Sequence, residues 1–182
     1  MSELRFREIG PDNKHGVYKY LREEDVWVYL DLEGIDPFIP KEKYAVIYFD
    51  NTKCHACRRY DIYWFPFVRS LSNKSSEFSF YIVLCSWFAR DCASLVASAT
   101  FTYFDVHASP TTVLLSWMDG KIVYKEKYDG VLSDIDLKTV VPSFPERVDR
   151  FLRGELVKPP LSKEDTLISL LSKLLRGKDT VG

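Results

Sequence analysis

The chain has 182 residues and a formal net charge of −1, with 46% hydrophobic and 28% charged residues. This length suits one globular domain with a substantial core, and the composition excludes a wholly disordered chain. The near-zero net charge excludes a strong overall attraction to nucleic acid or to an anionic membrane surface. We therefore expect neither nucleic acid nor a membrane as a partner.

The start of the chain predicts a cytoplasmic protein. Its first residues, MSELRFREIG, are charged from the third position on and lack the apolar centre of a secretory signal. No apolar run reaches the roughly 18–20 residues that a membrane-spanning helix needs. Cysteines of a cytoplasmic protein normally stay reduced, so a Cys-x-x-Cys there is more often catalytic or metal-binding than structural.

Residues 16–32 predict two β-strands. Apolar and polar residues alternate within GVYKYL and within VWVYLDL, and the charged run REED separates the two. This pattern indicates a hairpin or two edge strands. Turn-forming residues with two X-Pro steps follow at 34–40. We therefore interpret residues 1–43 as a β-rich extension that packs on the main domain.

Residues 44–103 predict two strand–helix units. The continuous apolar runs YAVIYF at 44–49 and FSFYIVLC at 78–85 are typical of strands buried on both faces. Helical spacing extends from Cys54 to Leu71 and resumes after Asp91, which we expect to cap the second helix. Alternating strands and helices predict parallel pairing through right-handed crossovers.

A hairpin and a helix are expected to complete the core, which we place at residues 44–154. The runs TTVLLSWM and KIVYKEKY flank Asp119-Gly120, a dipeptide that accommodates the positive φ values of a two-residue turn. Pro145 at a first helical position and Gly154 after the end describe a closing helix.

Residues 155–182 predict a linker and an amphipathic helix. The sequence KPP at 158–160 is typical of a linker, and the segment from Ser162 to Arg176 carries a broad leucine-rich face. That face packs on its own domain, forms a dimer contact or docks on another protein. The sequence leaves these alternatives open.

The most informative stretch is Cys54-His55-Ala56-Cys57, a few residues after the first buried strand. At the first turn of a helix, free N–H groups and the positive end of the helix dipole stabilise a thiolate. Cys54 is then a nucleophile near neutral pH, and Cys57, one turn below on the same face, can displace it from a mixed disulfide. Lys53 and His55 add charge that favours the thiolate, so we assign them a role in tuning the redox pair.

The order of these elements resembles the thioredoxin fold family over roughly residues 44–154: a buried strand, Cys-x-x-Cys at a helix start, a second strand, and Ala108-Ser109-Pro110-Thr111 before a hairpin. The resemblance implies an α/β, thioredoxin-like three-layer sandwich with a mixed central sheet and helices on both faces, plus the N-terminal β extension and the C-terminal helix. It also implies that Pro110 is cis and faces the cysteines, and that Ser109 contacts bound substrate.

The sequence departs from the family pattern beside the cysteines. Thioredoxins usually have Trp-Cys-Gly-Pro-Cys, whereas this chain has Lys-Cys-His-Ala-Cys, without the aromatic lid and the intervening proline. The family's buried acid, in the strand six residues before the first cysteine, corresponds to Tyr48. Asp50 and water are therefore the candidates to take the proton of Cys57.

Cys85 and Cys92 have no counterpart in the motif. Cys85 ends the second buried strand, and Cys92 lies among residues that make the interval from Cys54 to Pro110 longer than in a small thioredoxin. The two form a structural disulfide, a second redox pair or two free buried thiols. We favour a disulfide or close proximity, although a sequence does not show connectivity.

These features predict a thiol–disulfide oxidoreductase. Its Cys54/Cys57 pair reduces, oxidises or isomerises protein disulfides, and Ser109 and Pro110 bind the substrate. The partners are then protein substrates with thiols or disulfides and a redox-partner reductase, and no cofactor is needed.

Two other functions compete with this prediction. In a zinc site, Cys54 and Cys57 have the spacing of half a zinc ribbon. The remaining ligands would come from Cys85, Cys92, His55 or His107. The wider spacing of the second cysteine pair argues against a zinc site, so we predict no metal.

In a non-catalytic thioredoxin-like binding module, the last helix docks a partner and the cysteines are incidental.

Overall fold

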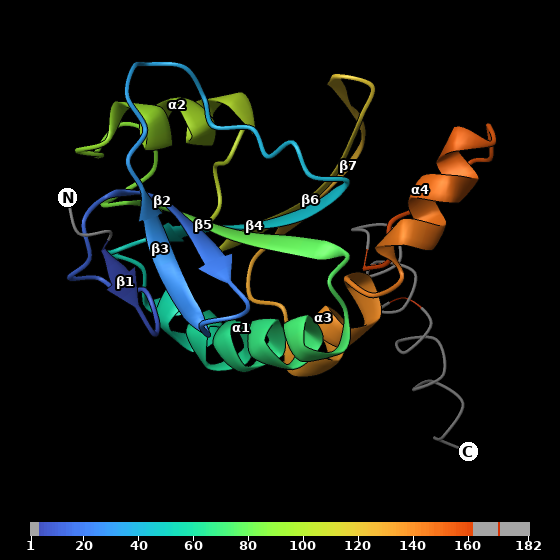
Figure 1. The fold of residues 1–182 in the computed structure, drawn as a ribbon, viewed down its shortest axis with the longest axis horizontal. Coiled ribbons are helices and arrows are strands. Elements are labelled where there is room, and N and C mark those ends of the chain that lie inside the picture. The colour runs from blue at the N-terminus through green and yellow to red at the C-terminus, as the bar shows by residue number, and fades with distance from the viewer. Residues whose placement is uncertain (1–3, 162–170, 172–182) are drawn as a thin grey trace.

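A mixed seven-stranded sheet runs through the computed structural model, which describes residues 4–161 and Leu171. The strand order is β1-β3-β2-β5-β4-β6-β7, and helices lie on both faces of the sheet (Figure 1). The strands are β1 (Arg5–Phe6), β2 (Gly16–Leu21), β3 (Val26–Leu30), β4 (Tyr44–Asn51), β5 (Phe78–Cys85), β6 (Thr111–Met118) and β7 (Lys121–Asp129). The helices are α1 (His55–Lys74), α2 (Leu95–Tyr103), α3 (Asp134–Val140) and α4 (Phe144–Leu152).

Strand β4 lies at the centre of the core. It pairs parallel with β5 and antiparallel with β6, and every one of its residues is buried. Val46 and Tyr48 pack among side chains of α1, α3 and α4, whereas Ile47 and Phe49 pack among those of α2. A strand covered on both faces needs apolar residues at successive positions, which explains the unbroken run in the sequence.

The N-terminal residues extend the same sheet. Strands β2 and β3 form the predicted hairpin, β2 pairs antiparallel with β5, and β1 pairs with β3. The aromatic residues of this hairpin contact the α1 side of the core, where the rings of Trp27 and Phe65 meet edge to face with centroids 5.9 Å apart. The N-terminal strands are therefore part of the same sheet as β4 and β5.

The β6–β7 hairpin turns at Asp119-Gly120, as predicted. Both residues have positive φ, at 51° and 78°, which is the geometry that this dipeptide accommodates. At the other end of the hairpin, the Ser109–Pro110 peptide bond that leads into β6 is cis, as the resemblance implied.

One helix was not predicted, and the predicted cap of another was wrong. The closing helix is preceded by α3, which Ser133 and Asp136 start with a reciprocal capping box. The side chain that caps α2 is Ser94, not Asp91. Asp91 instead forms a β-bridge with Trp87, three residues before the cap. The predicted C-terminal helix lies outside the described residues, apart from Leu171.

The succession β4-α1-β5-α2-β6-β7-α3, with the sheet between two helical layers, is a thioredoxin-like fold. In Figure 1, α1 and α3 lie below the sheet and α2 lies above it. No helix in the described part of the chain is both long and apolar enough to cross a bilayer.

A buried ion pair joins α4 to β7. Arg147 donates from Nε to Glu126 Oε1 at 2.6 Å and from Nη2 to Oε2 at 2.7 Å, and the two residues are only 6% and 2% exposed. The hydroxyls of Tyr124 and Tyr128 also donate to Glu126. All these donors converge on one carboxylate, so losing the guanidinium would leave a buried charge without its partner.

We predict that Arg147→Met lowers the free energy of unfolding by about 3–5 kcal/mol, because Glu126 stays buried without its counter-charge. Urea unfolding followed by circular dichroism measures the change. The matched control is Arg150→Met, which removes the exposed ion pair with Glu155 and should barely shift the midpoint. Equal midpoints for the two variants would contradict a structural role for the buried pair.

Candidate redox site

Cys54 caps the N-terminus of α1. Its backbone is extended, with φ −115° and ψ 107°, and the N–H of Cys57 donates to the Cys54 sulfur at 3.0 Å. A sulfur here occupies the place of the usual Ser, Thr or Asp cap. When the pair is reduced, the same N–H and the positive helix end stabilise the Cys54 thiolate.

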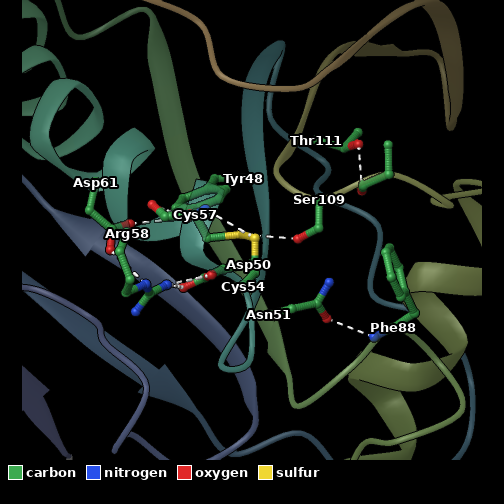
Figure 2. The surroundings of a disulfide bond; sticks show 11 residues. Tyr48, Asp50, Asn51, Cys54, Cys57, Arg58, Asp61, Phe88, Ser109 and Thr111 are labelled. Atoms are coloured by element: carbon green, nitrogen blue, oxygen red, sulfur yellow. Dashed lines mark hydrogen bonds and ion pairs between the residues drawn. A yellow bond between two sulfur atoms is a disulfide. The ribbon is translucent and has the colours of Figure 1, made fainter.

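Cys54 and Cys57 form a disulfide, with their Cα atoms 5.2 Å apart (Figure 2). The two sulfurs differ in access, because Cys54 is 7% exposed and Cys57 is fully buried. Cys54 is therefore the residue of the pair that retains contact with solvent. The Cys-x-x-Cys spacing predicted a redox pair, and in the structure these two cysteines are joined by a disulfide.

The segment before β6 lies against this disulfide. The Ser109 hydroxyl is 2.9 Å from the Cys57 sulfur, and Figure 2 shows it pointing from its loop toward the sulfur pair. Thr111 fixes the loop by donating to the Ala108 carbonyl at 2.9 Å, and the buried Pro110 follows Ser109 through the cis bond. The two stretches singled out in the sequence thus meet at the site.

A buried carboxylate, Asp50, and a partly exposed one, Asp61, share one guanidinium on the other side of the disulfide. Arg58 Nη2 donates to both oxygens of Asp50, at 2.5 and 2.6 Å, and Arg58 Nε lies 3.3 Å from Asp61 Oδ2. The Tyr48 hydroxyl donates to Asp61 Oδ1 at 3.0 Å and also lies 3.3 Å from the Cys57 carbonyl oxygen. We call Tyr48, Asp50, Arg58 and Asp61 the acidic cluster.

Burial makes both acids of the cluster weaker. Desolvation raises the pKa of Asp50 to about 6, although Arg58 opposes the rise. Desolvation and the neighbouring charge of Asp50 raise the pKa of Asp61 to about 7. The same burial raises the pKa of Tyr48 well above its ordinary value, so its hydroxyl stays a donor. Both carboxyls thus change charge near neutral pH.

The sequence identified only part of this cluster. Asp50 was named, with water, as a candidate to take the proton of Cys57. It follows Tyr48 by two positions, so the two residues share one face of the strand. Asp61 was missed, although it lies four residues after Cys57 and so on the same side of α1. That spacing was the available signal. The hydroxyl of Tyr48, at the family's acid position, connects Asp61 to the backbone of Cys57.

The predicted tuning residues have different surroundings. Lys53 pairs with Asp91 at 2.8 Å, and this hydrogen bond lowers the pKa of Asp91. Much of the Lys53 charge is therefore offset by a neighbour from another loop. His55 is exposed at the first residue of α1. A tuning role for these two residues stays a prediction.

Cys85 and Cys92 form a second disulfide, with their Cα atoms 4.6 Å apart. The structure thus selects the disulfide among the alternatives that the sequence left open. Cys85 is buried, and Cys92 is partly exposed. The bond closes a loop of residues 86–91, which we call the clasped loop.

The clasped loop holds the turn between β4 and α1. The N–H of Thr52 donates to the Cys85 carbonyl at 2.9 Å, and the N–H of Lys53 donates to the Ser86 carbonyl at 3.3 Å. Asn51 accepts the N–H of Phe88 on its side-chain oxygen at 2.6 Å, as Figure 2 shows. These bonds fix the residues immediately before Cys54. No local pattern predicted the Asn51 contact, because its two residues are far apart in the chain.

The ligand set of the zinc hypothesis is not assembled in this structure. The four cysteines form two separate disulfides. Within the described residues, no three or more His, Cys, Asp and Glu side chains are grouped so that they could hold a metal ion.

Comparison with known proteins finds likeness in structure only. No protein-family model matches the sequence, and no curated protein matches it either. Among solved structures, thioredoxin from Aeropyrum pernix aligns with a TM-score of 0.47 and 16% identity, over 75% of this chain and 97% of its own.

Two other thioredoxins align less extensively. Chloroplastic thioredoxin z has a TM-score of 0.40 and 12% identity, over 58% of this chain and 81% of its own. Mitochondrial thioredoxin 3 from Saccharomyces cerevisiae, in its oxidized form, has a TM-score of 0.38 and 21% identity, over 57% and 80%. We therefore base the function of this chain on the geometry of its own site.

The raised pKa of Asp61 predicts a pH dependence of stability. The carboxyl titrates at about 7 in the folded chain and near its ordinary value of 3.8 in the unfolded chain. Between these pH values the folded state holds more protons, so its contribution to stability falls as pH rises. Asp61→Asn removes this loss and should raise the free energy of unfolding at pH 8 by on the order of 2–4 kcal/mol.

Urea unfolding at pH 4 and at pH 8 measures this effect. The gain from Asp61→Asn should be present at pH 8 and nearly absent at pH 4. The control Asp119→Asn, in the hairpin turn, should give the same difference from the parent chain at both pH values. A gain from Asp61→Asn that does not vary with pH would show that the carboxyl does not titrate in this range.

Proposed function

We propose that the protein is a thiol–disulfide oxidoreductase that exchanges disulfides with other proteins through Cys54 and Cys57. One observation carries the proposal. The pair has an accessible sulfur at a helix N-terminus and a buried sulfur one turn below, beside the Ser109 hydroxyl at 2.9 Å. This arrangement supplies a nucleophile and a resolving thiol in one rigid element.

The reaction starts with the reduced pair. The Cys54 thiolate attacks one sulfur of a substrate disulfide, a new S–S bond forms between Cys54 and the substrate, and the other substrate sulfur leaves as a thiolate that takes up a proton. The N–H of Cys57 and the helix dipole stabilise Cys54 before the attack. Ser109 and Pro110 form the adjacent surface on which the substrate chain binds.

Cys57 completes the cycle. Its thiol loses a proton, its sulfur attacks Cys54, and the second substrate sulfur leaves as a thiol while the Cys54–Cys57 disulfide forms. Two electrons and two protons have then passed to the substrate. The proton of Cys57 needs an acceptor, and the acidic cluster offers carboxyls that titrate near neutral pH.

The same steps run backward when the partner is a dithiol. The pair then oxidises its substrate, and repeated cycles isomerise incorrect disulfides. A reductase or another dithiol restores the reduced form in the forward direction. No bound cofactor is needed, because the two cysteines carry the electrons.

Substitution of each cysteine tests the proposal. Cys54→Ser should reduce the rate of insulin-disulfide reduction with dithiothreitol to the uncatalysed rate, because the accessible nucleophile is gone. Cys57→Ser should leave the first step intact and accumulate a mixed disulfide with the substrate, visible on a non-reducing gel. The comparison variant Cys85→Ala/Cys92→Ala keeps both sulfurs of the Cys54/Cys57 pair, so it should still reduce insulin above the uncatalysed rate, although opening the clasped loop should slow the reaction. Activity retained by Cys54→Ser would remove Cys54 as the nucleophile.

The role of the acidic cluster has a separate test. In a single turnover, the rate at which Cys57 resolves the mixed disulfide should rise with pH between about 6 and 7, following the carboxyls of Asp50 and Asp61. Asp50→Asn/Asp61→Asn should abolish that rise, because neither amide accepts a proton. The first step, attack by Cys54, provides the internal control and should keep its pH profile. An unchanged profile for resolution would exclude the cluster as proton acceptor.

A further inference from the structure

The clasped loop is a rigid element at the edge of the redox site. The Cys85–Cys92 disulfide closes it, and within it the N–H groups of Ser86 and Trp87 both donate to the Asp91 carbonyl, at 2.9 and 3.0 Å. Phe88 adopts a positive φ of 56°, held by the bond from its N–H to Asn51. The loop thus has a fixed shape beside the turn that carries Cys54.

Two aromatic side chains of the loop anchor it on opposite faces of the sheet. Trp87 packs against the apolar cluster that contains Cys54 and Cys57, and Phe88 packs against the cluster on the α2 side. Trp87 is only partly buried. A partly exposed indole therefore lies next to the redox pair, in a chain that has Lys53 where thioredoxins usually have tryptophan.

Two surface hollows flank the loop, and Arg90 lines both. The first, of about 540 Å³, is bounded by Lys53, Trp87, Arg90 and Asp91. The second, of about 400 Å³, extends from Phe88 and Arg90 to His107, two residues before Ser109. One hollow is therefore lined by the residue before Cys54, and the other by a residue of the segment that leads to Ser109.

Most charges at these hollows already have partners. Lys53 pairs with Asp91 at 2.8 Å, and His107 pairs with Asp105 at 2.6 Å. Arg90 is exposed and makes no ion pair or hydrogen bond with the rest of residues 4–161. A guanidinium without a partner is suited to bidentate pairing with a carboxylate.

We propose that the clasped loop is a recognition surface for the protein substrate, on which Arg90 pairs with an acidic side chain near the reacting cysteine. Trp87 supplies apolar contact for the neighbouring residue of that substrate. The occupant is a polypeptide segment, because the hollows adjoin Cys54 on one side and the Ser109 loop on the other. This inference rests on the proposed function, since it names the substrate class of the same site.

Matched peptide disulfides test the inference. Two synthetic peptides of equal length each carry one disulfide, flanked by glutamates in one peptide and by lysines in the other. The reduced full-length protein is mixed with each, and the second-order rate of disulfide reduction is measured. The acidic peptide should react about tenfold faster at low ionic strength, and the preference should shrink as salt screens the charges.

Charge reversal at Arg90 should invert this preference. Arg90→Glu should slow the acidic peptide and accelerate the basic one, and Arg90→Lys should retain the original order with a smaller ratio. The control Lys121→Glu makes the same change in net charge at the far turn of the β6–β7 hairpin and should keep the parent preference. An equal shift in the Arg90→Glu and Lys121→Glu variants would overturn the inference, because it would reflect net charge alone.

Uncharged hydroxyethyl disulfide separates the inference from the proposed function. The parent chain and Arg90→Glu should reduce it at the same rate. If hydroxyethyl disulfide is reduced while the acidic and basic peptides react equally fast with the parent chain and with Arg90→Glu, the recognition surface is excluded. The proposed oxidoreductase function is then retained. If none of the three disulfides is reduced, the proposed function is overturned, and the inference with it.

Discussion

The structure depends most on how helix α1 begins. The cap of this helix is a sulfur, so the hydrogen bond that starts the helix is also the bond that prepares Cys54 for chemistry. Everything around it fixes that starting point. Strand β4 is held between β5 and β6, and the clasped loop bonds to the residues that join β4 to the cap. A change in any of these contacts would move Cys54, the proposed nucleophile.

Much of the fold followed from local patterns. The run at 44–49, the Asp119-Gly120 turn and the helix after Cys54 are encoded by neighbouring residues, so the sequence predicted them. The prediction of the cap of α2 was wrong because Ser94 and Asp91 are both good capping residues. Asp91 lies in the clasped loop instead, where it bridges to Trp87 and pairs with Lys53. Asp61 was missed because its role depends on folding next to Tyr48 and Arg58.

In the acidic cluster, one cation contacts two carboxyls of different exposure, the buried Asp50 and the partly exposed Asp61. Arg58 holds Asp50 through two short hydrogen bonds and contacts Asp61 less closely. Burial raises the pKa of both acids, and the charge of Asp50 adds to the rise at Asp61. The cluster thus places two carboxyls with raised pKa values on the α1 side of the sheet, Asp50 buried and Asp61 partly exposed. Only the folded positions of β4 and α1 create this arrangement.

The antiparallel pairing of β2 with β5 has a consequence for how the chain behaves when it is shortened. Strand β5 is apolar along nearly its whole length, and β2 covers its outer backbone. Removal of residues 4–30 would turn β5 into a long, flat, uncharged edge, which is a template for pairing with a second molecule. In the intact chain the sheet ends on this side in β1, a strand of two residues. The N-terminal hairpin therefore protects the edge of β5 from pairing with a second molecule.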